Sequence, residues 1–159
     1  MRVSVIGAGE CCSTIYNEAM ALGRLLAKEG HVVICGGKGG VMEAVAQGVA
    51  MEGGITLGIL PGREIREANK YITHAIATGL GEMRNFLVVL NGDVVVAISG
   101  KYGTLSEIAL AKKIGKEVIV IGRWKDIDGV IPVQGPREAI KKIREMERLH
   151  EEAVGAVED

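Results

Sequence analysis

Short segments that are apolar at every position recur along this chain. Residues 94–98 read V-V-V-A-I and residues 118–121 read V-I-V-I, with no polar residue at alternate positions. A strand of this kind is buried on both faces, which is typical of a parallel sheet covered by helices on each side. This feature therefore predicts an α/β fold and argues against a sheet with one solvated face.

Segments of helical periodicity separate the apolar ones. We expect strands at residues 2–7, 31–35, 55–60, 93–98 and 118–121. We expect helices at residues 14–29, 41–52, 83–90 and 105–114, and a last helix that starts near Pro136. Residues 61–70 are interpreted as a loop and residues 71–78 as a candidate short strand, whereas residues 124–134 have no assigned element.

This order of elements predicts the architecture. Strands that alternate with helices, joined by right-handed crossovers, give a three-layer, doubly wound parallel sheet of Rossmann-like type. We expect one domain over residues 1–150, followed by a polar C-terminal tail at residues 151–159 that frays.

Composition excludes several classes of protein. The net charge is -1, so no basic footprint for nucleic acid is present. The apolar segments are too short to cross a bilayer, and no signal peptide precedes the first strand. The three cysteines, Cys11, Cys12 and Cys35, form no disulfide or zinc-binding pattern. We therefore expect a cytoplasmic protein that binds neither nucleic acid nor membrane.

Glycine-rich turns follow three of the expected strands: G-A-G-E at 7–10, G-G-K-G-G-V-M at 36–42 and S-G-K-Y-G-T at 99–104. Glycine lets backbone N–H groups converge on an anion, and the helix that follows adds free donors and positive partial charge. All three turns are expected at one edge of the sheet. The predicted phosphate-binding residues are Gly7, Gly9, Gly36, Gly37, Gly39, Gly40, Gly100, Lys101, Gly103 and Thr104.

Two familiar phosphate-binding motifs do not fit. Gly37-Lys38 resembles the end of a P-loop, but Gly39 stands where that motif needs Ser or Thr. The turn at Gly7 does not continue to G-x-G-x-x-G, because position 12 is Cys12. We therefore exclude a P-loop ATPase and an ordinary NAD-dependent dehydrogenase.

Residues 99–107, S-G-K-Y-G-T-L-S-E, resemble the P-G-G-x-G-T-x-x-E motif of the Lonely Guy (LOG) family, also called lysine decarboxylase-like. Residues 36–42 are similar to that family's G-G-G-x-x-G-x-M segment, and Arg84 stands where the family has its arginine. The resemblance implies a Rossmann-type fold, a homo-oligomer and no required cofactor. It also implies hydrolysis of the N-glycosidic bond of nucleoside 5′-monophosphates, with Arg84 and Glu107 as catalytic residues.

The chain departs from that motif at three positions. Ser99 replaces the proline, Lys101 replaces a glycine, and Asn85 stands where a lysine usually follows the arginine. A sister group with this shorter architecture includes the molybdenum-cofactor carrier proteins, which are similar in fold. Two hypotheses follow: a nucleotide-binding protein with phosphoribohydrolase activity, and a non-catalytic carrier or sensor of a phosphorylated cofactor such as the molybdenum cofactor.

Each candidate residue has a structural alternative. Thr104 and Glu107 have the spacing of a capping box at a helix start, which would occupy both side chains. Arg84 could be a solvated arginine at the start of a helix, and Lys101 an exposed loop lysine. The histidines show no ligand spacing with cysteines or carboxylates, so we expect no metal site.

Overall fold

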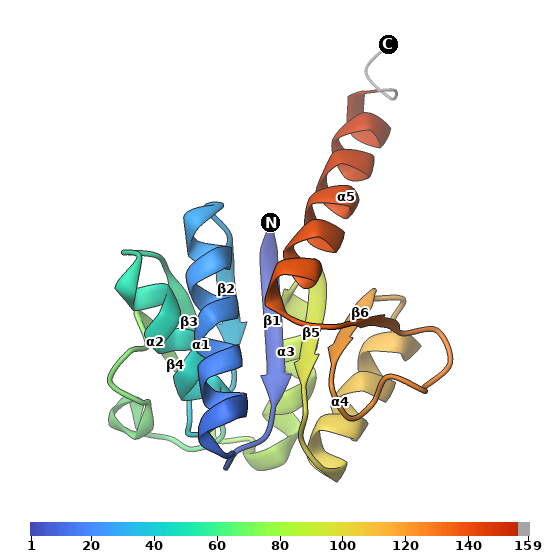
Figure 1. Cartoon of the computed structure of the whole chain (residues 1–159). Coiled ribbons are helices and arrows are strands. Elements are labelled where there is room, and N and C mark those ends of the chain that lie inside the picture. The colour runs from blue at the N-terminus through green and yellow to red at the C-terminus, as the bar shows by residue number, and fades with distance from the viewer. Residues whose placement is uncertain (156–159) are drawn as a thin grey trace.

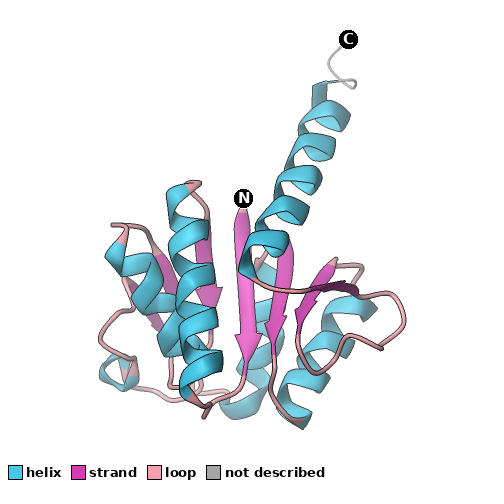
Figure 2. Cartoon of the chain, viewed as in Figure 1, coloured by secondary structure: helices cyan, strands magenta, loops and turns pink. Residues whose placement is uncertain are grey.

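The computed structural model describes residues 1–155. A seven-stranded sheet lies between two layers of helices (Figures 1 and 2). Its strands, in spatial order, are β4 (His74–Ala77), β3 (Thr56–Leu60), β2 (Val32–Cys35), β1 (Arg2–Gly7), β5 (Val94–Ile98), β6 (Val118–Ile121) and β7 (Ile131–Val133). Every neighbouring pair is parallel, which confirms the predicted doubly wound, Rossmann-like α/β fold.

Two apolar cores fill the space on the two faces of the sheet. On one face the core lies under α1 (Ser13–Lys28), α2 (Val41–Met51) and α5 (Pro136–Gly155). On the other it lies under α3 (Arg84–Asn91) and α4 (Tyr102–Lys113). All five residues of β5 are buried, so the residues of this strand contribute alternately to both cores, as its continuous apolar sequence predicts.

Helices α1 and α2 pack at unusually short range through two glycines. A Cβ on Gly23 would lie 2.2 Å from the carbonyl oxygen of Val45, and one on Gly48 would lie 2.0 Å from that of Met20. Both positions therefore need glycine for packing, and neither has a role in the glycine-rich turns.

Most element boundaries lie within one residue of the sequence expectation, and larger differences occur in three places. Helix α4 begins at Tyr102, before the expected residue 105. Strand β7 occupies part of the unassigned segment 124–134, and Pro132 is tolerated there because β7 lies at the edge of the sheet. Helix α5 extends to Gly155, so residues 151–155 of the expected tail are helical and exposed, and residues 156–159 lie outside the described residues.

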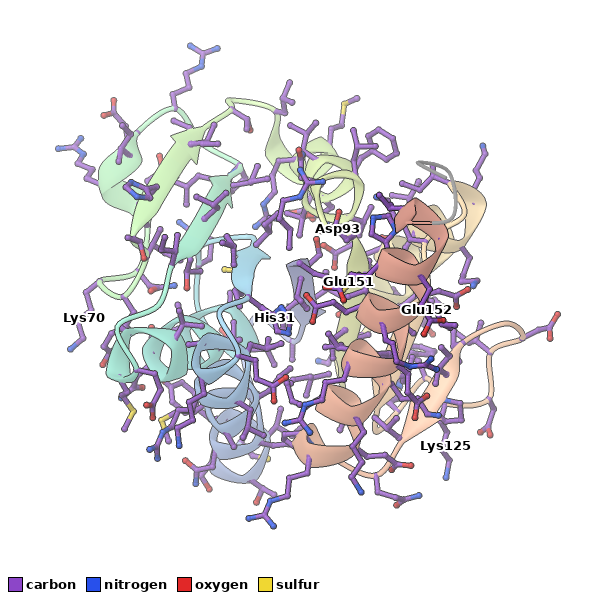
Figure 3. The ribbon with its side chains drawn as sticks, turned by 90° about the horizontal axis from the view of Figure 1, so that it is seen from above. His31, Lys70, Asp93, Lys125, Glu151 and Glu152 are labelled. Carbon is purple, nitrogen blue, oxygen red and sulfur yellow. The ribbon has the colours of Figure 1, made fainter. Side chains whose placement is uncertain are left out.

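The remaining expectations for local structure agree with the observed fold. Residues 71–78 contain β4, and residues 61–70 form a loop with one short 3-10 turn, η1 (Ile65–Glu67). His31, just before β2, is 3% exposed and its Nδ1 atom lies 3.2 Å from the Met1 ammonium nitrogen. Figure 3 looks onto the edge of the sheet at which the strands begin, where His31 and Asp93 lie.

Candidate functional site

A pocket of about 590 Å³ opens at the edge of the sheet where the strands end. Its walls include residues that follow β1, β2, β5 and β6. The strand order reverses between β1 and β5, which is the place where doubly wound folds have their crevice. We call this cavity the switch-point pocket. In Figure 1 the strands end at the lower edge of the sheet, toward which their arrows point.

Helices α1, α3 and α4 all begin at the switch-point pocket. The residues that precede α1 and α4, Cys12 and Lys101, make no side-chain capping hydrogen bond. Within residues 1–155, the backbone N–H groups of 102–104 have no hydrogen-bond acceptor. A helix start with free N–H donors favours an anion. The pocket therefore carries the electrostatic character expected of a phosphate site.

The turn between β5 and α4 has an unusual backbone. Ser99 has a φ of 52° and Gly100 a φ of 91°, so two consecutive residues adopt left-handed conformations. The Ser99 N–H donates to the carbonyl oxygen of Ile121, which ties the turn to the neighbouring strand. This reversal carries the chain from the buried end of β5 into α4 and presents Gly103 and Thr104 to the pocket.

The predicted glycines divide into two groups. Gly7, Gly9, Gly36, Gly100 and Gly103 line the pocket, as do Lys101 and Thr104. The other three, Gly37, Gly39 and Gly40, do not.

Packing explains two residues of the second group, Gly37 and Gly40. A Cβ on Gly40 would lie 2.2 Å from the carbonyl oxygen of Ala8, and one on Gly37 would lie 2.7 Å from Leu60 Cδ2. These residues let the turn after β2 rest directly on its neighbours. By contrast, nothing lies within 4 Å of a Cβ built on Gly9 or Gly103.

Arg84 lines the pocket and is buried, with 7% of its surface exposed. Its Nε donates to the carbonyl oxygen of Ile59 at 2.9 Å and its Nη2 to that of Gly36 at 3.2 Å. Its Nη1 donates to Asn85 Oδ1. These contacts exclude the alternative of a solvated helix-start arginine. They also hold the guanidinium rigidly beside the pocket without neutralising its charge.

Glu107 lies on α4, is 8% exposed and lines the pocket. Burial raises the pKa of Glu107 to about 8; the positive charge of Arg84 opposes this rise and the negative charge of Glu82 adds to it. Glu107 is therefore mostly a neutral acid at pH 7. Among the described residues, no hydrogen bond reaches its carboxyl group and no ion pair joins it to Arg84.

The capping-box alternative for Thr104 and Glu107 is wrong. Because α4 begins at Tyr102, Thr104 is already inside the first turn and Lys101 occupies the capping position. Thr104 is 3% exposed and its hydroxyl faces the turn at Gly100. Both side chains therefore remain free to contact a ligand.

The pocket also contains polar residues that the motifs did not indicate. Arg123 follows β6, places its Nη1 3.4 Å from the carbonyl oxygen of Gly100, and stacks over the ring of Trp124. Glu82 accepts a hydrogen bond of 3.3 Å from Asn85. Arg123 could have been found from its position, because it follows a strand of a parallel sheet at the ligand-binding edge. Glu82 carries no comparable sequence signal.

Two further features of the described residues bear on function. Over residues 1–155, no group of three or more His, Cys, Asp or Glu side chains is placed to hold a metal ion. In the same part of the chain, no helix has both the length and the apolar sequence that crossing a membrane needs.

The fold and the pocket define a class: a single-sheet α/β protein of Rossmann type, open at its topological switch point and lined there by helix starts. More narrowly, the chain belongs to the SLOG cluster4 family, whose sequence model matches residues 1–153. This membership confirms the resemblance that the glycine motifs indicate.

Known relatives are similar over most of the chain. An uncharacterized protein of Archaeoglobus fulgidus is 43% identical over 140 residues, which cover 88% of this chain and 92% of that one. The molybdenum cofactor binding protein of Rippkaea orientalis has 36% identity and a TM-score of 0.87, over 91% of this chain and 96% of that one. The molybdenum cofactor carrier protein of Chlamydomonas reinhardtii has 29% identity and a TM-score of 0.82, over 91% and 96%.

Proposed function

We propose that this protein binds and carries a phosphorylated cofactor of the molybdenum-cofactor type. The observation that carries the proposal is the start of α4, where the N–H groups of residues 102–104 have no acceptor within residues 1–155 and where Gly103 and Thr104 line the switch-point pocket. Such donors suit a phosphate group. The similarity to a binding protein and a carrier protein of the molybdenum cofactor supports the choice of ligand.

The state of Glu107 favours a carrier over a hydrolase. Cleavage of an N-glycosidic bond passes through an oxocarbenium-like state, which an ionised carboxylate would stabilise. With a pKa of about 8, Glu107 is mostly protonated at neutral pH, so little of that negative charge is present. A neutral acid instead offers a hydrogen-bond donor to a bound anion without repelling it.

The size and surroundings of the pocket also fit a carrier. A volume of about 590 Å³ lies within the range of small-molecule and cofactor sites. Lys101 and Arg123 stand at its wall and add positive charge on the side of the α4 turn. We infer that the phosphate of the cofactor lies against this turn, and that the rest of the molecule extends toward Arg84.

The direct test is to identify what the protein retains. The chain is purified without oxygen from cells that make the molybdenum cofactor, and the released small molecules are analysed by mass spectrometry, with molybdenum measured by elemental analysis. We expect a phosphorylated pterin together with molybdenum. Purified protein that carries neither, from cells shown to contain the cofactor, would overturn the proposal.

The matched control is Gly103→Asp. Position 103 has open space around it, and an acidic residue in the first turn of a helix is favourable, so the variant should fold normally. The new carboxylate would face the N–H groups of the turn and repel phosphate. We therefore expect the variant to lose the retained ligand while its unfolding transition is unchanged.

The hydrolase hypothesis is tested separately. Wild-type protein is incubated with AMP and related monophosphates, and the release of free base is followed by chromatography. A carrier gives no release above the rate without protein. Release by wild type that Glu107→Gln abolishes would instead assign the phosphoribohydrolase activity.

A further inference from the structure

Arg84 is a buried cation with no carboxylate partner. Its three hydrogen bonds to protein oxygens go to two backbone carbonyls and the amide of Asn85, all uncharged groups. No ion pair among the described residues includes it. A guanidinium has five N–H donors, so at least one donor on this group is left for a ligand. Burying such a charge without a counter-ion is costly, and an anion in the pocket would remove that cost.

Glu107 is the buried acid in the same pocket as the Arg84 cation. It is more than nine-tenths buried, lines the same pocket and has no hydrogen-bond partner among residues 1–155. Its carboxyl oxygens are not among the fully buried side-chain atoms that lack a partner, so they are accessible from the pocket. A buried acid and a buried cation that line the same pocket, with no ion pair between them among residues 1–155, form an arrangement that a ligand can complete.

We propose that Arg84 and Glu107 form a second anion subsite in the switch-point pocket, in which Arg84 balances the charge of an oxyanion and protonated Glu107 donates a hydrogen bond to it. The inference rests on the proposed function, because it takes the α4 turn as the place of the phosphate. It adds that the ligand carries a second acidic group, such as a molybdate-like oxyanion, at the part of the pocket that Arg84 and Glu107 line.

This arrangement predicts how the affinity for the second anion depends on pH. An oxyanion stabilises the protonated form of Glu107 and is repelled by the ionised form. Because the pKa of Glu107 in the ligand-free protein is about 8, the protein binds the anion without proton uptake at low pH and must take up a proton above that value. Affinity for the second anion should therefore be constant below about pH 7 and fall about tenfold per pH unit above about pH 8.

Other ionisable groups share the pocket with Glu107 and Arg84, namely Glu10, Cys11, Cys12, Glu82, Lys101 and Arg123. Burial raises the pKa of the Cys11 thiol, and the negative charge of Cys12 adds to that rise. Thiol ionisation at high pH could imitate the expected loss of affinity. The double variant Cys11→Ser, Cys12→Ser is therefore the control, and it should keep the pH dependence of the wild type.

The experiment is calorimetric titration of the ligand-free protein with molybdate, which remains a dianion from neutral to alkaline pH. Wild type should bind molybdate with the pH profile given above. Glu107→Gln should bind at every pH with no decline, because the amide also donates a hydrogen bond and does not ionise. Arg84→Met should lose binding and Arg84→Lys should retain part of it, with folding of both checked by circular dichroism.

The outcomes separate the two proposals. Absence of molybdate binding by wild type, or an identical decline in wild type and Glu107→Gln, would overturn the second subsite. Gly103→Asp should weaken binding of inorganic phosphate, whereas the molybdate binding that the variant retains should keep the pH dependence of the wild type. Phosphate binding that is insensitive to Gly103→Asp would instead contradict the placement of phosphate in the proposed function.

Discussion

The hydroxyl oxygen of Thr104 occupies the space that a side chain on Gly100 would need. A Cβ built on Gly100 would lie 2.0 Å from Thr104 Oγ1 and 2.6 Å from its Cβ. Thr104 is 3% exposed and cannot easily move aside. The missing side chain at residue 100 thus sets the position of the Thr104 hydroxyl in the pocket, and it links the shape of the β5–α4 turn to ligand binding.

Replacing Gly100 by alanine should damage this turn. The left-handed backbone at φ 91° and the overlap with Thr104 together should cost about 1–3 kcal/mol of unfolding free energy. Urea denaturation measures the loss. Gly103→Ala is the control: with open space at that position, it should be neutral or stabilise by up to about 1 kcal/mol. Equal effects of the two substitutions would contradict the role given to Gly100.

Gly40 and Gly9 provide a second comparison between a glycine needed for packing and a glycine that lines the pocket. Gly40→Ala should unfold or strongly destabilise the protein, because its Cβ would lie 2.2 Å from the backbone oxygen of Ala8. Gly9→Ala should change the unfolding free energy by no more than about 1 kcal/mol, since its surroundings are empty. Thermal unfolding followed by circular dichroism distinguishes them. A stable Gly40→Ala variant would show that the turn after β2 is not closely packed.

Glu107 should make stability fall as pH rises. An unfolded glutamic acid ionises near its ordinary pKa of 4.5, whereas folded Glu107 keeps its proton up to about pH 8. Between these values the folded state binds more protons, so the unfolding free energy declines by at most about 1.4 kcal/mol per pH unit. Glu107→Gln removes this contribution. Urea denaturation from about pH 5 to about pH 8 measures the unfolding free energy of both proteins. The value for Glu107→Gln minus the value for the wild type should increase as pH rises.

Arg84 should matter for stability as well as for binding. Arg84→Met leaves the carbonyl oxygens of Ile59 and Gly36 without their charged donor. Unsatisfied buried acceptors should cost about 2–4 kcal/mol in total. Arg84→Lys should recover only part of this loss, because one ammonium cannot reach all three acceptors. If Arg84→Lys had the unfolding free energy of the wild type in denaturation experiments, the positive charge at residue 84 alone would account for its effect on stability.

Arg123 should contribute to ligand binding and not to the stability of the fold. Its side chain is exposed, and its long contact with the carbonyl oxygen of Gly100 contributes little to stability. Arg123→Ala should weaken binding of inorganic phosphate by less than about tenfold, as expected for a solvated cation. The unfolding midpoint should stay within error of the wild type. A large loss of stability would place Arg123 in the structural framework instead.

The predicted homo-oligomer and the predicted cytoplasmic location stay predictions. Light scattering measures the first directly.

Several features were available from the sequence alone. The continuously apolar strands required burial on both faces, and the helical periods between them required covering layers, so the doubly wound fold followed. Glycine at positions such as 100 and 103 marked the edge at which a ligand would be expected. The sequence did not predict the edge strand β7, because only Val133 of its three residues is buried and Pro132 weakens the strand pattern.

Other features were decided only by the tertiary structure. Gly40 and Gly103 look alike in the sequence, yet one packs on Ala8 and the other faces open space. The proton on Glu107 depends on burial and on the charges of Arg84 and Glu82, which come from a different part of the chain. Local patterns report which backbone conformations are favourable, whereas desolvation and charge depend on which distant segments the fold brings together.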